Sequence, residues 1–473
     1  MHSHDEPTVK ESVEAAHGPW WRDVTGYQWF VFAVATLGWL FDTMDQQLFN
    51  LARKPAVTEL LATSPGVAAP DADVSYYSGL TTSIFILGWA TGGIIFGILG
   101  DKIGRAKTMI LTILTYSAFT GLSAISHSVW DFSAYRFLTG LGVGGQFAVG
   151  VALVAEVMSD RARPHALGWL QALSAVGNMS AAMIGITLGM MQESGAINNA
   201  WRVMFLIGLV PAILAIPVFL KLKEPEAWSK AARKEEAEEA EEAAGGQPAH
   251  KLGSLAELFT DPRWRRNTIV GMVLAFAGVV GLWGIGVFSN DLSQTVLKKH
   301  YANSGLSPEE LAGKLAFWAG MTLLMFNFGA FFGIHGFAWV AERLGRRPAF
   351  AISFVLAGLS TAATFWLLTE FWQIFVFVPV MGFCQLTLFG GYAIYFPELF
   401  PTRLRSTGIS FCYNVARFVA AFGAFALGYL TSHVFAGFED PMRYAGVTMC
   451  GIFVIGLLAL PFAPETLGKP LPE

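Results

Sequence analysis

Long apolar stretches separated by short polar segments recur along the whole chain. Each stretch holds about 20 residues, which as a helix rising about 1.5 Å per residue crosses a hydrocarbon core of about 30 Å. The pattern predicts an all-α membrane protein with twelve transmembrane helices. The expected spans are residues 27–51, 77–99, 108–126, 132–158, 166–190, 203–220, 268–290, 316–340, 349–368, 372–396, 406–432 and 444–462.

Two polar loops occur twice in the chain. GDKIGRAK (residues 100–107) returns as AERLGRRP (341–348), and EVMSDRAR (156–163) returns as ELFPTRLR (398–405). The copies keep a separation of 241 or 242 residues, and two unrelated motifs rarely share one spacing by chance. The repeat predicts two homologous halves, which in an apolar chain are typical of transporters.

The repeat and the spans together predict five segments and an orientation. The segments are a tail (1–26), a six-helix bundle (27–220), a hydrophilic linker (221–266), a second six-helix bundle (267–462) and a second tail (463–473). With the N-terminus inside, most Lys and Arg residues fall in cytoplasmic loops, as the positive-inside rule requires; Arg53 and Lys54, placed in an outer loop, are exceptions. We therefore expect a multi-pass protein of the bacterial inner membrane with both termini cytoplasmic and no cleaved signal peptide.

Composition narrows the classes of partner. Hydrophobic residues make up 54% of the chain and charged residues 14%, against roughly 25% charged residues in soluble proteins. We therefore expect the protein to be embedded in a lipid bilayer. A net charge of -4 gives no argument for a nucleic-acid partner. The sequence shows neither a metal-ligand cluster nor a nucleophile with a base. We expect no metal site, no cofactor and no enzymatic activity, but a monomer that binds a small-molecule substrate.

Two motifs carry a resemblance to a known family. GILGDKIGRAK (97–107) resembles the signature loop of the major facilitator superfamily, and RFLTGLGVGG (136–145) resembles that family's fourth-helix motif. The resemblance covers the whole six-plus-six plan and implies a cytoplasmic latch, since an acid at a helix end can cap a neighbouring helix and pair with arginines. The alternative is that the basic residues only set topology. The implied latch residues are Asp101, Arg105, Glu156, Arg161 and Arg163 in the first half and Glu342, Arg346, Glu398 and Arg403 in the second.

Four charges remain at bilayer depth, where unpaired charges are costly. Asp42 and Asp45 share one face of the first span, and Arg136 and Arg417 lie in the fourth and eleventh. Two arginines facing a cavity favour an anion, because guanidinium grips a carboxylate bidentately. Two desolvated, mutually repelling carboxylates favour binding protons. We predict that the aspartates couple protons and that the arginines contact the substrate; the alternative is an aspartate that permanently neutralises Arg136.

Uncharged polar side chains complete the predicted substrate site. A polar group buried in lipid needs a partner, which is either the substrate or a neighbouring helix. Asn414 lies three residues before Arg417 on one helix face. The candidates are Asn414, Gln171, Asn178, Gln385 and Tyr392.

The D-x-x-D of the first span resembles the acidic motif of aromatic-acid/proton symporters, and the overall pattern is similar to sialate and monocarboxylate symporters and organic-anion transporters. The resemblance implies alternating access with proton-coupled symport of a monocarboxylate or aromatic carboxylate, the proton being the coupling ion. The tail PETLGKPLPE (464–473) is similar to that of sugar porters, so sugar or polyol symport is the alternative. A non-transporting nutrient sensor is a third possibility, although neither linker nor tail offers a signalling domain.

Overall fold

A computed structural model describes residues 19–62, 70–244, 247, 249–286 and 289–473. These residues form helices joined by short turns, with no strand among them. Most of the predicted tail 1–26 lies outside the described residues. The helices are α2 (Gly26–Leu61), α3 (Asp71–Lys102), α4 (Arg105–Ser123), α5 (Val129–Val157), α6 (Arg163–Glu193), α7 (Ala200–Ile207), α8 (Ala215–Lys221), α9 (Glu226–Ala243), α10 (Glu257–Thr260), α11 (Pro262–Val279), α12 (Ser289–Tyr301), α13 (Pro308–Leu344), α14 (Arg346–Leu367), α15 (Ile374–Leu399), α16 (Arg405–Tyr429), α17 (Pro441–Met449) and α18 (Ile452–Ala459).

Short turns of 3₁₀ or π geometry extend or join these helices. The π turns η3 and η7 continue α11 and α16, and the 3₁₀ turn η2 joins α7 to α8 within the sixth predicted span. The turns are η1 (Trp20–Asp23), η2 (Val210–Leu214), η3 (Val280–Ile285), η5 (Phe371–Gln373), η6 (Thr402–Leu404), η7 (Leu430–Val434) and η8 (Leu460–Phe462).

Local sequence explains where several helices begin. Capping boxes, in which the N-cap hydroxyl and the N3 side chain each bind the other residue's backbone N–H, start α2, α5 and α13. Gly104 and Gly345 precede α4 and α14 with φ of 108° and 98°, a region that favours glycine. They are 241 residues apart, so the tight turn after α3 is repeated after α13.

Nine helices in the described part of the chain are long and apolar enough to cross a membrane. The other three predicted spans correspond to α2, α4 and α16, whose polar and charged residues reduce their hydropathy. The first span differs most from expectation, because α2 runs through Pro55 to Leu61. Arg53 and Lys54 therefore lie within the helix, not in a loop, and Arg53 donates to the hydroxyl of Thr82 in α3 at 2.6 Å.

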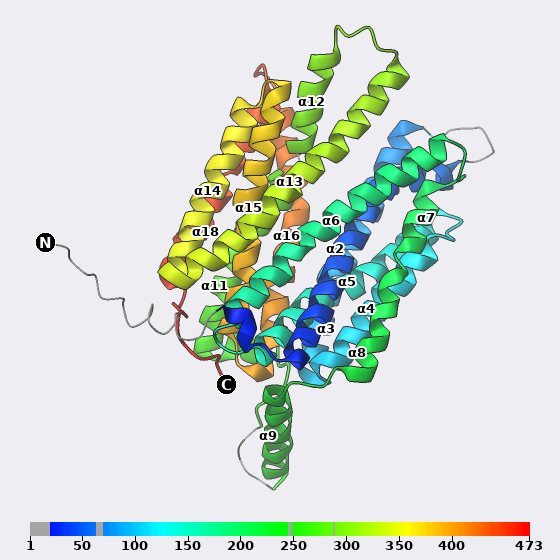
Figure 1. The fold of residues 1–473 in the computed structure, drawn as a ribbon. Coiled ribbons are helices and arrows are strands. Elements are labelled where there is room, and N and C mark those ends of the chain that lie inside the picture. The colour runs from blue at the N-terminus through cyan, green and yellow to red at the C-terminus, as the bar shows by residue number, and fades with distance from the viewer. Residues whose placement is uncertain (1–18, 63–69, 245–246, 248, 287–288) are drawn as a thin grey trace, which may run out of the picture.

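Figure 1 shows two sets of helices lying against each other, α2 to α8 (the first bundle) and α11 to α18 (the second bundle). The linker helix α9 projects from one end, here named the linker end; the opposite end is the distal end. The bundles meet at the linker end and diverge toward the distal end. The turn η1 and the C-terminal tail both lie at the linker end, where they bind Arg161 and Arg405.

The bundles touch most extensively along two helix pairs, or seams: α3 with α16, and α6 with α13. In the first seam the Ser410 hydroxyl donates to the carbonyl of Gly93. In the second, Asn178 donates to the side-chain oxygen of Asn327 at 2.9 Å. Because α13 is the repeat counterpart of α3 and α6 that of α16, the second seam is the first one repeated.

Glycines allow α3 and α5 to pack closely within the first bundle. A Cβ added at Gly92 would overlap the backbone of Leu141, and one added at Gly144 would overlap the backbone of Trp89 and Gly93. Small residues that let backbones approach are typical of packed membrane helices. The glycine motif of α5 is therefore a packing surface.

Candidate functional site

Asp101, near the end of α3, fastens the first bundle to the second. Its carboxylate accepts hydrogen bonds from the backbone N–H groups of Ser406 and Thr407 at 3.1 and 2.8 Å, and from the Thr407 hydroxyl at 2.6 Å. Arg105 lies 3.0 Å from the same carboxylate, and both side chains are fully buried. The N-terminus of α16 favours an anion through its free N–H groups and its dipole.

Glu156 lies between an arginine of each bundle. Arg105 binds its two oxygens at 3.1 and 2.8 Å, and Arg405 of the second bundle lies 2.8 Å away. Arg105 also donates to the carbonyl of Thr402 at 2.7 Å. The three charged side chains are at most 1% exposed. The first copy of the repeated loop is therefore a buried network that crosses between the bundles.

The second copy of the loop is arranged differently. Arg346 binds both oxygens of Glu398 at 3.0 and 2.6 Å, within the second bundle. Glu342 crosses to the first bundle, where its carboxylate lies 3.2 Å from Nε2 of His165 in α6. These two side chains are 28% and 32% exposed. The second copy thus makes a crossing contact between two partly exposed side chains.

Three predicted latch residues bind other partners at the linker end. None of the contacts described for them crosses between the bundles. The contacts are Arg161 with Asp23 of η1 at 2.8 Å, Arg163 with the carbonyl of Ala155 at 2.8 Å, and Arg403 with Glu257 of α10.

Two glutamates that were not predicted cap the helices after the repeated turn. Glu224 accepts hydrogen bonds from the backbone N–H groups of residues 105–107 at 2.6 to 3.2 Å, and Glu465 from those of 346–347 at 2.9 and 3.1 Å. The two are 241 residues apart and each adjoins a proline, so the repeat offset was the available signal. Burial raises the pKa of Glu465, but the backbone donors outweigh burial and hold that pKa below its ordinary value.

Arg136 lies inside the first bundle. Its guanidinium is 3.8 Å from Asp45 and donates to the hydroxyls of Ser123, at 3.0 and 2.8 Å, and Thr139, at 2.9 Å. The ring of Phe205 lies 4.6 Å away, and both charged side chains are fully buried. All these partners belong to the first bundle, an arrangement like the alternative in which Asp45 neutralises Arg136; contact with substrate stays a prediction.

Arg417 lies where the two bundles meet. Its guanidinium stacks on Trp89 of the first bundle at 4.0 Å and on Tyr413 of its own helix at 4.2 Å. It donates to the side-chain oxygen of Asn414 at 2.8 Å, and its Nε has no hydrogen-bond partner among the described residues. Tyr413 was not predicted; its position one helical turn before Arg417 was the available signal.

Asp42 of α2 acts electrostatically on Arg417 from the first bundle. One carboxylate oxygen accepts from Gln46 at 3.4 Å, and the other has no hydrogen-bond partner in the described part of the chain. Asp45, one turn further along α2, repels it. The structure therefore assembles a central group from both bundles: Asp42, Trp89, Tyr413, Asn414 and Arg417.

The remaining predicted substrate residues differ in how many of their side-chain polar atoms have hydrogen-bond partners. Gln171 and Gln385 are 2% and 1% exposed, and their side-chain oxygens have no partner among the described residues. Three of these residues bind neighbouring helices: Asn178 binds Asn327 at 2.9 Å, Gln385 binds Thr361 at 2.6 Å, and Tyr392 binds the carbonyl of Leu274 at 2.7 Å.

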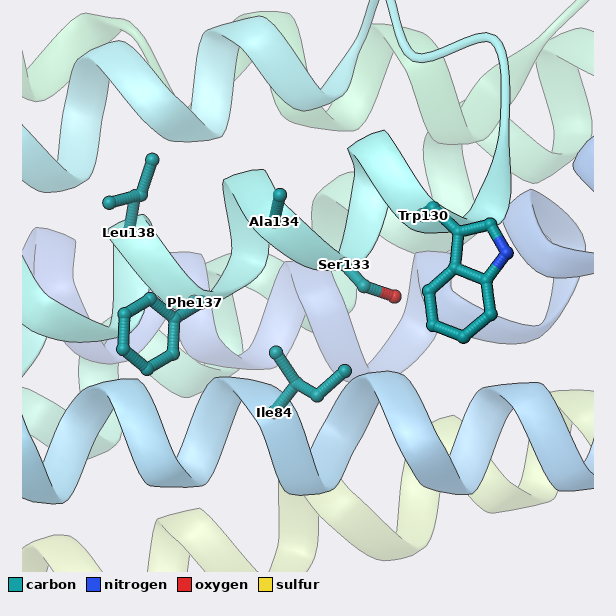
Figure 2. A pocket seen from close by; sticks show the side chains of 6 residues that line it. All are labelled: Ile84, Trp130, Ser133, Ala134, Phe137 and Leu138. Atoms are coloured by element: carbon teal, nitrogen blue, oxygen red, sulfur yellow. The ribbon is translucent and has the colours of Figure 1, made fainter.

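A groove between α3 and α5 lies apart from these charges. Figure 2 shows Ile84 on one side and Trp130, Ser133, Phe137 and neighbouring residues on the other. Trp130 is 63% exposed, and the hydroxyl of Ser133 is already bonded to Thr81 at 2.9 Å. The lining carries no charge that could hold an anion. No group of three His, Cys, Asp or Glu side chains placed to hold a metal occurs among the described residues.

Comparisons with known proteins agree with this architecture. The family model described as "Sugar (and other) transporter" matches residues 24–259 and 270–471. A putative metabolite transport protein of Haemophilus influenzae is 30% identical over 82% of this chain and 86% of its own. The cis,cis-muconate transport protein of Acinetobacter baylyi is 27% identical over 79% of this chain and 83% of its own. The solved proton:xylose symporter XylE of E. coli shares the fold, with a TM-score of 0.71, 17% identity, and coverage of 94% and 98%.

Proposed function

The chain belongs to the sugar (and other) transporter family of the major facilitator superfamily, and from that premise we propose that it carries a small organic acid across the membrane together with protons. The family membership makes it a transporter with a twelve-helix fold. The substrate class, the coupling ion and the direction are the proposal, in which the two bundles rock about the central group by alternating access.

The environment of Arg417 carries the proposal. A guanidinium that stays ionised and keeps an unpartnered Nε offers a carboxylate a charged hydrogen bond. Trp89 and Tyr413 flank it at about 4 Å, and their faces suit the flat carbon skeleton of an unsaturated or aromatic acid. The relative from Acinetobacter, described as a muconate transporter, supports an acid of this kind. We assign Arg417 and Asn414 to substrate binding.

We assign proton coupling to the aspartates of α2. Asp42 is fully buried, has an unpartnered oxygen and lies within electrostatic range of Arg417, so a proton on Asp42 would leave the positive charge of Arg417 to the incoming carboxylate. Asp45, the second aspartate of α2, lies 3.8 Å from Arg136 inside the first bundle and forms an ion pair with it. Protonation of either aspartate changes the charge that faces the substrate.

The linker end is the cytoplasmic end in this proposal. The positive loops, the linker and both described chain ends lie there, and the protein would be a monomer of the bacterial inner membrane with both termini cytoplasmic. The contacts of Asp101, Arg105, Glu156 and Arg405 join the bundles at this end. The structure then corresponds to a state closed toward the cytoplasm, and breaking these contacts would open the inward-facing state.

Sugar symport is the second candidate, favoured by two buried amides. The side-chain oxygens of Gln171 and Gln385 have no partner among the described residues, and a polyol would supply hydroxyl donors for them. The xylose symporter, which shares the fold, supports this second candidate. Measuring whether an organic acid or a sugar is transported distinguishes the two candidates.

Uptake into proteoliposomes tests the proposal. Labelled cis,cis-muconate, benzoate and xylose are offered with and without an inward proton gradient. We expect an acid to accumulate only with the gradient, Asp42→Asn to abolish accumulation while retaining exchange, and Arg417→Lys to weaken the acid about 10- to 100-fold. Accumulation of xylose alone, or gradient-independent uptake unchanged in Asp42→Asn, would overturn the acid or the proton assignment respectively.

A further inference from the structure

The two acids that cross between the bundles are repeat counterparts with different partners. Glu342 follows Asp101 by 241 residues, and Ser406 follows His165 by the same number. Asp101 binds the backbone N–H of Ser406 and Thr407, whereas Glu342 lies 3.2 Å from the imidazole of His165. The first contact is to neutral backbone donors; the second changes its charge when the imidazole binds a proton.

The first turn of α6 explains why Glu342 does not repeat the backbone cap. The N–H groups of Arg163 and Ala166 already donate to the carbonyls of Ser159 and Ala162, both at 2.9 Å. Pro164 has no N–H to offer. An incoming carboxylate therefore finds few free backbone donors in this turn, and Glu342 instead lies at ion-pair distance from the imidazole of His165.

His165 is held between the two bundles and open to water. The ring of Trp20 in η1 stacks on its imidazole at 5.3 Å with an interplanar angle of 12°, which fixes the ring opposite Glu342. The side chains of His165 and Glu342 are 32% and 28% exposed. The contacting oxygen of Glu342 is itself buried, but the exposed part of the imidazole is open to protons from the solvent at the linker end.

The other charges around this contact already have partners of opposite charge or an aromatic face. Close pairs of opposite sign largely cancel at the distance of a neighbouring site. Glu342 is therefore the acid to which a positive imidazole responds most strongly. These neighbours are Arg161 with Asp23 of η1 at 2.8 Å, Arg163 with Asp160 at 2.8 Å, and Arg343 of α13 stacked on Trp339 at 4.0 Å.

We propose that His165 and Glu342 form a proton-sensitive bridge that closes the linker end more firmly as the pH falls. A protonated imidazole makes an ion pair with a charge-assisted hydrogen bond, whereas the neutral ring makes a weaker, uncharged one. The contribution to closure is complete while the imidazole is protonated and is lost as the pH rises through its titration. If the linker end is cytoplasmic, as the proposed function has it, acidification of the cytoplasm slows further proton-coupled uptake.

Distance measurements on the full-length protein in nanodiscs test the bridge without any substrate. Spin labels at Lys107→Cys and Pro348→Cys, repeat counterparts exposed at the linker end, are placed in a background with Cys384, Cys412 and Cys450 changed to Ala. We expect the population with separated labels to rise about fivefold from pH 5.5 to pH 8. His165→Gln and Glu342→Gln should each flatten this dependence.

Two further variants keep the test decisive. His165→Arg, which carries a permanent charge, should keep the linker end closed across the whole pH range. His335→Gln removes the other histidine of the α6 and α13 seam, which packs on Trp169 at 4.1 Å, and should leave the pH dependence intact. A His165→Gln protein that retains the full pH dependence, or a His335→Gln protein that loses it, would overturn the bridge whether or not the protein carries an acid.

Discussion

The acids and arginines of the first bundle's repeated loop make buried contacts that cross to the second bundle, while Arg346 and Glu398 of the second copy pair with each other. Asp101, Arg105 and Glu156 are fully buried, and their contacts reach α16, Thr402 and Arg405 of the second bundle. Arg346 and Glu398 are 5% and 9% exposed and pair within one bundle. Since a buried charge that loses its partner is costly, we expect the network around Glu156 to act as the main latch and the Arg346–Glu398 pair to act as a brace for its own bundle.

The largest expected effect comes from removing the acid shared by two buried arginines. Glu156→Gln leaves Arg105 and Arg405 short of one charge, and we expect it to lower the free energy of unfolding by about 3–5 kcal/mol. Glu398→Gln, the matched change in the second copy, removes the ion pair of one arginine, Arg346, and weakens the hydrogen bond from the Thr466 hydroxyl; it should cost about 1–2 kcal/mol. Unfolding by SDS in mixed micelles measures both. An equal or larger loss in Glu398→Gln would remove the distinction between latch and brace.

An intermediate effect is expected from the two crossing acids. Asp101→Asn weakens the cap on α16, and we expect about a tenfold rise in the linker-end open population at every pH. Glu342→Gln should raise it about fivefold, and only at the acidic pH where the imidazole is charged. The spin-label pair at residues 107 and 348 reports both populations. A pH-dependent effect of Asp101→Asn matching that of Glu342→Gln would show that the two crossings are equivalent.

The smallest effect concerns the cap on α14. Because the folded-state pKa of Glu465 lies below its ordinary value, its carboxylate stabilises the fold above the unfolded-state pKa of about 4.3. That contribution is lost as the pH falls through the lower folded-state pKa. Glu465→Gln should therefore lower thermal stability slightly at pH 7 and remove part of the decline below pH 4.5. Melting curves from pH 3.5 to 7 measure it; a variant that keeps the full acid decline would contradict the cap.

Several contacts at the linker end could be predicted because the residues that make them occur twice in the sequence. Acids and arginines recur at one offset, and a charge repeated at a helix end needs a partner nearby. The same offset would also have revealed Glu224 and Glu465, which cap α4 and α14. The choice of partner was not predictable, since Arg161 and Arg403 pair with Asp23 and Glu257 through segments that carry no copy of the motif.

The four intramembrane charges were visible in the sequence, but their arrangement was not. Asp42 and Asp45 share a helix face, yet Asp45 pairs with Arg136 inside the first bundle, while Asp42 interacts with Arg417 between the bundles. Helical periodicity fixes which residues share a face. It does not fix which neighbouring helix that face meets.

The sequence by itself determined the twelve spans, the two halves and the residues that break the symmetry between them. Hydropathy, helix period and repeat offset depend only on the order of the residues along the chain, not on which helices become neighbours. Only the tertiary structure decided that Arg417 stacks between Trp89 and Tyr413, and that Glu342 meets His165 and not a helix end. Those contacts depend on how each helix is rotated and how closely it packs. The rotation and the spacing of each helix are set by the side-chain volumes and glycines of helices that are far apart in the sequence.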